Sequence, residues 1–177
     1  IDDKEVQYKN INEVLNSSDV IILSGGVSMG KADYVPEILR ELGVKNIFHK
    51  ILQRPGKPMW FGIGPKGQLV FALPGNPVST ITCCRHYVIP ALNLASGQRN
   101  IISEFVQLQK NIIFKPPLTY LLPVKIRNSK NGILEANPVE TNPSGDFTTL
   151  IDTDGYIELP SNKEEFNKSE IFSFYRW

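Results

Sequence analysis

The stretch that decides the fold is Ser18-Asp-Val-Ile-Ile-Leu-Ser-Gly-Gly-Val-Ser-Met-Gly-Lys-Ala-Asp-Tyr34. In the segment 19–23, Asp19 is followed by a continuous apolar, largely β-branched run, which is typical of a strand buried on both faces of a parallel sheet. A glycine loop follows at 24–30, and a helix is predicted over 33–42, ended by Gly43. Strand, glycine loop and helix make the first half of a βαβ unit, so this region predicts an α/β fold.

The residues around this stretch extend the pattern. Ile11, Val14 and Leu15 predict a short helix, for which Asn10 or Asn12 would be the N-cap. Further elements are a helix that Pro90 kinks or interrupts and three strands, the last two joined as a hairpin by the turn at 64–67. The predicted helix is 77–95, and the strands are 47–52, 59–63 and 69–73.

The pattern changes near Gly97. From there on, short alternating runs are separated by prolines and by Asn, Ser and Gly clusters, which predicts a small all-β barrel or sandwich. We therefore expect two domains, an α/β domain at 1–96 and a β domain at 97–177. The predicted strands of the second domain are 101–108, 120–126, 132–136, 156–159 and 171–175.

Composition excludes several classes of protein. The chain has 177 residues, of which 41% are hydrophobic and 21% charged, as in ordinary globular proteins. No apolar run approaches the ~20 residues of a membrane-spanning helix. Cys83 and Cys84 are adjacent, which does not fit a disulfide framework or a tetrahedral zinc site, and a reducing, cytoplasmic setting is expected. The chain starts at Ile1 without a Met, and we expect a fragment of a longer protein.

Charge is unevenly distributed, although the net charge is only +1. No Asp or Glu occurs between Glu41 and Glu104, so this segment should create a local positive potential. We interpret it as an anion site; the alternative is that its cations lie on a solvated face and pair with acids elsewhere. No helix-turn-helix or RNA-binding signature accompanies it, so nucleic acid is not expected. The cations are Lys45, Lys50, Arg54, Lys57, Lys66, Arg85 and Arg99.

The glycine loop is the first candidate site. After a strand and before a helix, free backbone N–H groups and the helix dipole favour an anion, and Ser24 and Ser28 add hydroxyl donors. The loop is neither a Walker A motif nor a G-x-G-x-x-G fingerprint, and a tight turn is the alternative reading. Asp33 is at the start of the next helix, where it would cap the N-terminus or, beside phosphates, hold Mg²⁺.

Two proline-containing turns are the second candidate. The segment Arg54-Pro-Gly-Lys-Pro58, preceded by Lys50, would aim two cations at one point, and the turn at 74–77 carries the Asn76 amide. A pre-organised backbone in an acid-free region suits an oxyanion, whereas the alternative is a pair of ordinary strand-ending turns.

Other chemistry-bearing side chains are interpreted as structural. His49 and His86 lack a third ligand at a suitable spacing for a metal. Cys83 and Cys84 lie within a predicted helix without a nearby base, so we expect buried, unreactive packing residues. Trp60 is expected in the core, with stacking on a flat heterocycle as the alternative.

Taken together, residues 18–34, 54–58 and 73–79 resemble the MoeA/gephyrin family of molybdopterin molybdotransferases in order and spacing. Residues 142–150 and 154–160 resemble the family's last, β-barrel domain. The resemblance implies a partial three-layer α/β/α molybdopterin-binding domain followed by a small all-β barrel domain. The motif rich in Thr and Gly that usually opens the family's α/β domain is absent, so an incomplete sheet is expected.

The resemblance also implies a function in molybdenum cofactor biosynthesis. The family takes adenylylated molybdopterin, releases AMP and inserts molybdate with the help of Mg²⁺. It works as a homodimer in the cytoplasm, and a contact with molybdopterin adenylyltransferase is a further expectation. The alternative is a non-catalytic anion-binding module, or a scaffold that binds peptides, as gephyrin does.

The family's functional residues carry over to matching positions of this sequence. Arg54 stands where the family often has Lys, and a planar guanidinium is not equivalent to an ammonium. The implied catalytic residues are Asp33, Lys50 and Lys57, and the implied metal ligands are Asp2 and Asp33. The implied substrate-binding residues are Ser24, Gly25, Gly26, Ser28, Gly30, Arg54, Pro74, Gly75, Asn76 and Pro77.

Overall fold

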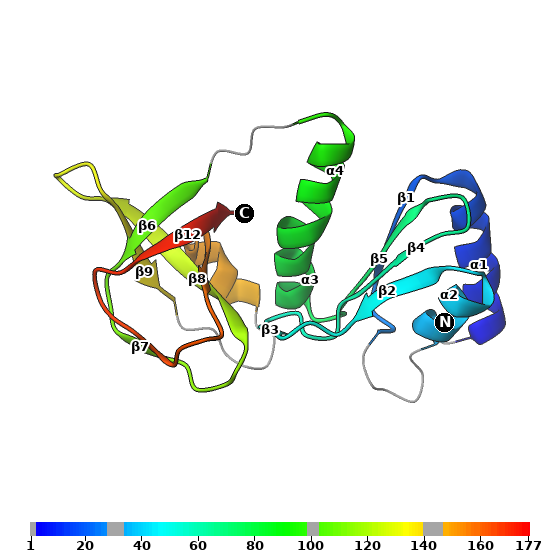
Figure 1. Cartoon of the computed structure of the whole chain (residues 1–177), viewed down its shortest axis with the longest axis horizontal. Coiled ribbons are helices and arrows are strands. Elements are labelled where there is room, and N and C mark those ends of the chain that lie inside the picture. Colours follow the sequence, from blue (N-terminus) through cyan, green and yellow to red (C-terminus); the bar gives the residue numbers. More distant parts are fainter. Residues whose placement is uncertain (1–2, 28–33, 99–102, 140–146) are drawn as a thin grey trace. The chain divides into compact units, whose positions relative to one another are not determined.

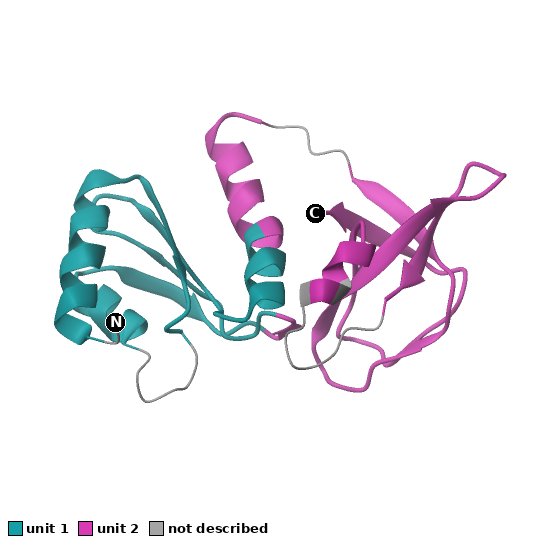
Figure 2. Ribbon diagram, turned by 180° about the vertical axis from the view of Figure 1, so that it is seen from behind, with its two compact units in different colours: residues 1–51, 56–84 teal, residues 52–55, 85–177 magenta. Residues whose placement is uncertain are grey.

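A computed structural model describes residues 3–27, 34–98, 103–139 and 147–177 (Figure 1). The chain divides into two compact units, coloured separately in Figure 2. The first comprises Ile1–Ile51 and Gly56–Cys84, and the second comprises Leu52–Pro55 and Arg85–Trp177. This division crosses the chain between Cys84 and Arg85, whereas the sequence placed the domain boundary after residue 96.

The first unit is built on a four-stranded sheet. Its strand order is β1(Val20–Ser24), β5(Leu69–Leu73), β4(Trp60–Ile63), β2(Lys45–His49). β1 and β5 are parallel, while β4 is antiparallel to both of its neighbours, β5 and β2. The predicted β4–β5 hairpin is therefore confirmed. Because β2 and β5 are both antiparallel to β4, β2 runs in the same direction as β1 and β5, and their carboxyl ends lie at one edge.

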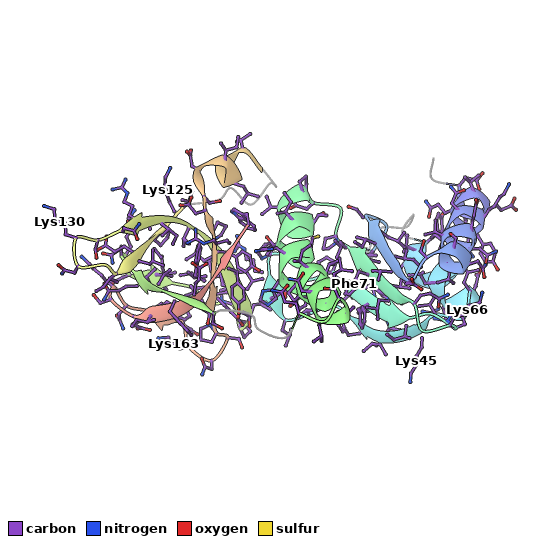
Figure 3. The ribbon with its side chains drawn as sticks, turned by 90° about the horizontal axis from the view of Figure 1, so that it is seen from above. Lys45, Lys66, Phe71, Lys125, Lys130 and Lys163 are labelled. Carbon is purple, nitrogen blue, oxygen red and sulfur yellow. The ribbon has the colours of Figure 1, made fainter. Side chains whose placement is uncertain are left out.

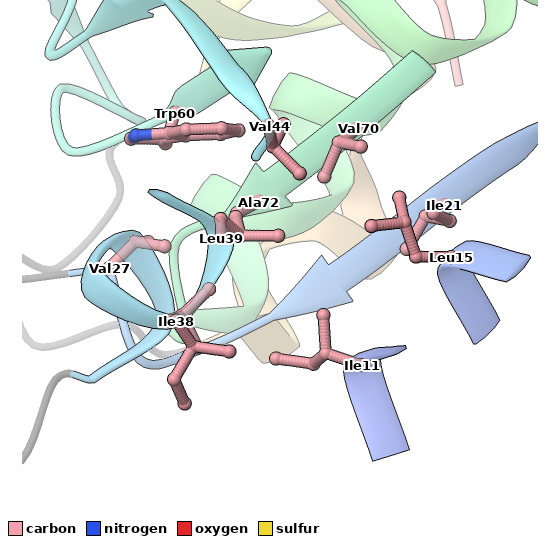
Figure 4. Packing of buried hydrophobic residues seen from close by; sticks show 11 residues of the cluster. Ile11, Leu15, Ile21, Val27, Ile38, Leu39, Val44, Trp60, Val70 and Ala72 are labelled. Carbon is pink, nitrogen blue, oxygen red and sulfur yellow. The ribbon is translucent and has the colours of Figure 1, made fainter. Parts of the chain in front are cut away.

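Helices α1(Lys4–Ser17) and α2(Val35–Glu41) cover one face of this sheet. Ile11 and Leu15 of α1 pack with Ile38 and Leu39 of α2 in a buried cluster that also contains Ile21 of β1 (Figure 4). The expected cap of the first helix, Asn10 or Asn12, was wrong. Asp3 caps it instead, because its side chain accepts hydrogen bonds from the N–H groups of the next turn.

The other face of the sheet is covered differently. Figures 1 and 3 show α3(Pro77–Cys83) on the side of the sheet away from α1 and α2, with the side chain of Phe71 of β5 labelled in Figure 3. Phe71 packs against the ring of Phe61 at a centroid distance of 4.8 Å. The expectation that β1 is buried on both faces was wrong for Ile22. Its side chain is 48% exposed, whereas Ile21 on the helix-covered face is 2% exposed.

The predicted helix at 77–95 is interrupted, as its proline indicated. α3 is followed by a π-helical turn, Cys84–Val88, and then by α4(Ile89–Ala95). Pro90 has no N–H, and in a regular α-helix its ring would collide with the carbonyl four residues earlier. The wider π turn directly before Pro90 relieves that collision.

The second unit contains a closed five-stranded barrel. The hydrogen-bonded ring runs β10(Gly155–Leu159), β12(Ile171–Arg176), β6(Glu104–Leu108), β9(Leu134–Pro138), β8(Thr119–Asn128) and back to β10. Alternate side chains fill its interior, among them Val106, Leu122, Val124, Ala136 and Ile157. The five predicted strands are confirmed as elements, with shifted ends.

Several short elements of the second unit were not predicted. Three of them are strands of only two residues, which is too short to show a periodic pattern. β3(Gln53–Arg54) adds to the barrel sheet beside β8, and β7(Ile112–Ile113) pairs with β11(Glu165–Phe166). The 3₁₀-helix Phe147–Asp152 precedes β10. None of the helices in the described part of the chain combines the length and the apolar character needed to cross a membrane.

We predict that Leu15→Ala lowers the free energy of unfolding of the first unit by about 2–5 kcal/mol, because a 5%-exposed side chain is removed from a packed core. Val14→Ala, one residue earlier and 41% exposed, is the matched control and should change it by less than about 0.5 kcal/mol. The measurement is urea unfolding followed by Trp60 fluorescence in a Trp177→Phe background. Equal losses for the two variants would contradict this packing.

Candidate functional site

The candidate site is the edge of the first unit's sheet at which β1, β5 and β2 end. Ser24 of β1 pairs with Leu73 of β5. The preceding residue of β5, Ala72, pairs with Trp60 of β4, and Trp60 pairs with His49 of β2. Ligands of α/β sheets bind beyond the carboxyl ends of the strands, where the connecting loops converge. This edge therefore gathers the loops that the sequence singled out.

The glycine loop leaves β1 in a conformation that requires glycine. Gly25 and Gly26 have φ values of +88° and +71°, in the left-handed region. A Cβ on Gly26 would lie 2.6 Å from Cγ2 of Val35, so the loop packs closely on the start of α2. The N–H of Gly25 donates to the carbonyl of Leu73 at 3.0 Å. The N–H groups of Gly26 and Val27 have no acceptor among the described residues.

The proline turn lies directly beside the glycine loop. A Cβ on Gly75 would lie 3.4 Å from Cα of Gly25, so the two backbones are in close approach. Asn76 is the N-cap of α3, and its side-chain oxygen accepts from the backbone N–H of Ser79 at 3.1 Å. The Asn76 oxygen is thereby committed, which leaves its NH₂ group as a donor.

Further contacts hold this turn in place. Pro77 occupies the first turn of α3, where its missing N–H costs nothing. The hydroxyl of Thr80 donates to the carbonyls of Pro74 and Asn76. Sequence reasoning missed Thr80, although a Thr four residues after the cap is a typical position for bonding back to the turn.

The two predicted lysines belong to the loop that follows β2. Lys50 has a left-handed backbone, φ +73°, and its N–H donates to the carbonyl of Met59 at 2.9 Å. The N–H of Ile51 donates to the carbonyl of Lys57 at 2.9 Å, which places the two lysines on one short, hydrogen-bonded loop. Lys50 and Lys57 are both exposed.

His49 connects this loop to the glycine loop, which sequence reasoning did not foresee. Its Nε2 lies 3.3 Å from the carbonyl oxygen of Val27. The only sequence signal was its position directly before Lys50, within the strand predicted at 47–52, whereas the observed β2 ends at His49. That signal becomes informative only once β2 is known to run in the same direction as β1.

Arg54 lies in the second unit. It belongs to β3, is paired with Tyr120 of β8, and holds its guanidinium 5.7 Å from the Tyr120 ring and 6.0 Å from the Phe114 ring. These two rings are stacked at a centroid distance of 4.4 Å. The sequence grouped Arg54 with the lysines, whereas the contacts given by the structure tie it to the barrel strands.

Four predicted site residues lie outside the described residues. They are Asp2, Ser28, Gly30 and Asp33, which include both proposed metal ligands. Within the described ranges, no group of three His, Cys, Asp or Glu side chains gathers in a way that would hold a metal ion.

The residues interpreted as structural are mostly confirmed. Trp60 and Cys83 are buried, and Cys84 is half-buried. His86 lies in the second unit against the rings of Tyr156 and Tyr175, and its Nδ1 is 3.0 Å from the Tyr156 hydroxyl. Burial lowers the pKa of His86 and raises the pKa of Tyr156. These groups form a neutral, hydrogen-bonded packing cluster.

The carboxyl edge offers mainly hydrogen-bond donors and positive charge. The donors are the N–H groups of Gly26 and Val27, the Ser24 hydroxyl and the NH₂ of Asn76, and the charges are Lys50 and Lys57. The sequence between Glu41 and Glu104 contributes no carboxylate to offset them. Donors and positive charge gathered in this way are suited to an anion and to negative charge that develops on it.

Comparisons with known proteins match both units. Residues 1–94 match the family described as "Probable molybdopterin binding domain", and residues 106–177 match "MoeA C-terminal region (domain IV)". The chain is 37% identical, over 99% of its length, to a molybdopterin molybdenumtransferase of Synechocystis sp., of which it covers 43%. It is 32% identical to a putative molybdopterin biosynthesis protein of Methanocaldococcus jannaschii, with 98% of this chain and 40% of that protein covered.

A solved structure has the same fold. The molybdopterin biosynthesis MoeA protein from Pyrococcus horikoshii superposes with a TM-score of 0.77 at 31% identity, covering 98% of this chain and 41% of its own. The chain thus spans less than half the length of each of these three proteins. From these matches, which cover both units, we conclude that the chain belongs to the MoeA family, of which it carries the molybdopterin-binding domain followed by the C-terminal region.

Proposed function

We propose that the chain is part of a molybdopterin molybdotransferase that acts in molybdenum cofactor biosynthesis. Its substrates would be adenylylated molybdopterin and molybdate, and AMP would be the product that leaves. The proposal rests on the family membership and on one structural observation. This observation is the close approach of the glycine loop and the proline turn at the carboxyl edge of β1 and β5.

In this proposal the phosphate groups of the substrate bind at that edge. The N–H groups of Gly26 and Val27 would donate to phosphate oxygens, because no described residue accepts from them. Asn76 would donate from its NH₂, since its oxygen caps α3. The backbone is already held by the Gly25–Leu73 and Thr80–Pro74 hydrogen bonds, so little reorganisation is needed on binding.

Lys50 and Lys57 would stabilise the negative charges of the AMP phosphate and of molybdate. Release of AMP leaves additional negative charge on its phosphate, and molybdate is itself a dianion. Two ammonium groups on a hydrogen-bonded loop, in a segment without carboxylates, would stabilise both. No covalent nucleophile is required, so catalysis would come from positioning and electrostatic stabilisation.

The cofactor and partners are proposed from the family resemblance. Mg²⁺ would be held by Asp2 and Asp33, which lie outside the described residues. The roles proposed for Asn76, Lys50 and Lys57 do not depend on it. Mg²⁺ bound between carboxylate and phosphate oxygens would supply charge neutralisation. A homodimer, a contact with molybdopterin adenylyltransferase and a cytoplasmic location complete the proposal.

We predict that Lys57→Ala weakens the binding of adenylylated molybdopterin about tenfold, the loss expected for one charge-assisted hydrogen bond. The control is Lys66→Ala, which also removes one positive charge but at the opposite end of β4. Lys66 lies near α1 (Figure 3), and its Nζ is 3.3 Å from Oδ1 of Asn16. This variant should change the affinity less than twofold. Isothermal titration calorimetry measures both. Equal effects of the two variants would show that the binding is not localised at the carboxyl edge.

We also predict that Asp33→Ala lowers the rate of AMP release from adenylylated molybdopterin and removes its dependence on Mg²⁺. The reason is that Asp33 would supply a carboxylate to the metal beside the phosphates. AMP release is measured by chromatography, with and without EDTA, on the parent chain, Asp33→Ala and Lys57→Ala. If the parent protein turns over and neither variant slows it, the assignment of these residues fails.

A further inference from the structure

A separate cavity of about 300 Å³ lies in the first unit, between α2 and the strands β2 and β4. Its volume is at the lower end of the range for small-molecule sites. Six described residues line it, from α2, from the turn after α2 and from the strands β2 and β4. They are Pro36 and Arg40 of α2, Val44 of the turn, Asn46 and His49 of β2, and Trp60 of β4.

Arg40 contributes a guanidinium to the lining of the cavity. The two nearest carboxylates in sequence, Glu37 and Glu41, both form ion pairs with Lys4, at 3.1 and 2.9 Å. Within the described residues, no carboxylate forms an ion pair with Arg40. A guanidinium with five N–H donors therefore faces the cavity without an acidic partner there.

The polar side chains of the cavity keep donors to spare. Nδ2 of Asn46 donates to the carbonyl of Phe48 at 3.1 Å, which leaves its second N–H. A carbonyl can only accept, so Nε2 of His49 carries the proton that faces Val27. No described residue accepts a hydrogen bond from the indole N–H of Trp60.

The remaining wall is rigid and apolar. The Trp60 ring is packed over Gly62, where an added Cβ would lie 2.4 Å from Cη2 of the indole. Figure 4 shows the indole beside Val44, in the same buried cluster. A bare oxyanion would satisfy the donors but leave much of the volume and the apolar wall of Val44 and Pro36 unused.

We propose that this cavity is a second anion site, which binds a small phosphate monoester. The phosphate would be held by Arg40 and Asn46, and the organic group would lie against Val44 and Pro36. Nothing in this assignment depends on the chemistry proposed for the carboxyl edge. His49 is common to both places, because its ring lines the cavity while its Nε2 contacts the glycine loop.

Trp60 provides the test, since the chain has only two tryptophans, Trp60 and Trp177. In a Trp177→Phe background, Trp60 emission is followed while AMP, adenosine or inorganic phosphate is added. We expect a saturable change with AMP, none with adenosine, and at least tenfold weaker binding of inorganic phosphate. Arg40→Gln should weaken AMP binding at least tenfold, and Lys66→Ala, which removes a positive charge at the opposite end of β4, less than twofold.

Four results would overturn the proposal. An unchanged AMP affinity in Arg40→Gln removes the cavity as the site, and a loss confined to Lys57→Ala moves the ligand to the carboxyl edge. Equal affinities for phosphate and AMP would exclude the ester as the preferred ligand. If Trp177→Phe fails to fold, the same titrations are followed with the unmodified chain, through the indole N–H resonance of Trp60 in the ¹⁵N spectrum. If this resonance does not shift when AMP is added, the proposal is also overturned.

Discussion

The parallel pairing of β1 with β5 is the constraint on which the candidate site depends. Five consecutive pairs, from Val20–Leu69 to Ser24–Leu73, fix the register of the two strands. The hydrogen bond from Gly25 to Leu73 extends this register by one residue into the loops. Two segments about fifty residues apart in sequence are thereby brought together, and the left-handed backbone at Gly25, φ +88°, favours glycine there.

The same sheet topology explains why the positively charged loop that carries Lys50 and Lys57 lies at the same edge as the glycine loop. β4 is antiparallel to both β5 and β2, so β2 runs in the same direction as β1. The loop carrying Lys50 and Lys57 therefore begins at the edge where the glycine loop begins. The contact of His49 with the Val27 carbonyl fixes the two loops to each other. A stretch of sequence without carboxylates becomes an edge that offers donors and positive charge.

Sequence patterns predicted the elements whose signal is local. β5 was predicted to the residue because its apolar run is bounded by a Gly turn and a proline turn, and the interruption at Pro90 follows from the missing N–H. The contacts that make the site are non-local and were not predictable. Nothing local to His49 points to Val27, and nothing local to Arg54 shows that it joins β8 of the barrel. Asp3 was overlooked as a cap because the apolar pattern used to predict α1 begins at Ile11, about two turns after the helix starts at Lys4.

The central claim is that the glycine loop and the proline turn form one anion site. The most direct measurement is the ¹H–¹⁵N spectrum of the chain during titration with adenylylated molybdopterin. We expect the amide signals of Gly26, Val27, Gly75 and Asn76 to shift together, with one common dissociation constant, while that of Gly67 at the opposite edge stays in place. Shifts confined to one of the two loops, or two distinct dissociation constants, would contradict the claim that they act as one site.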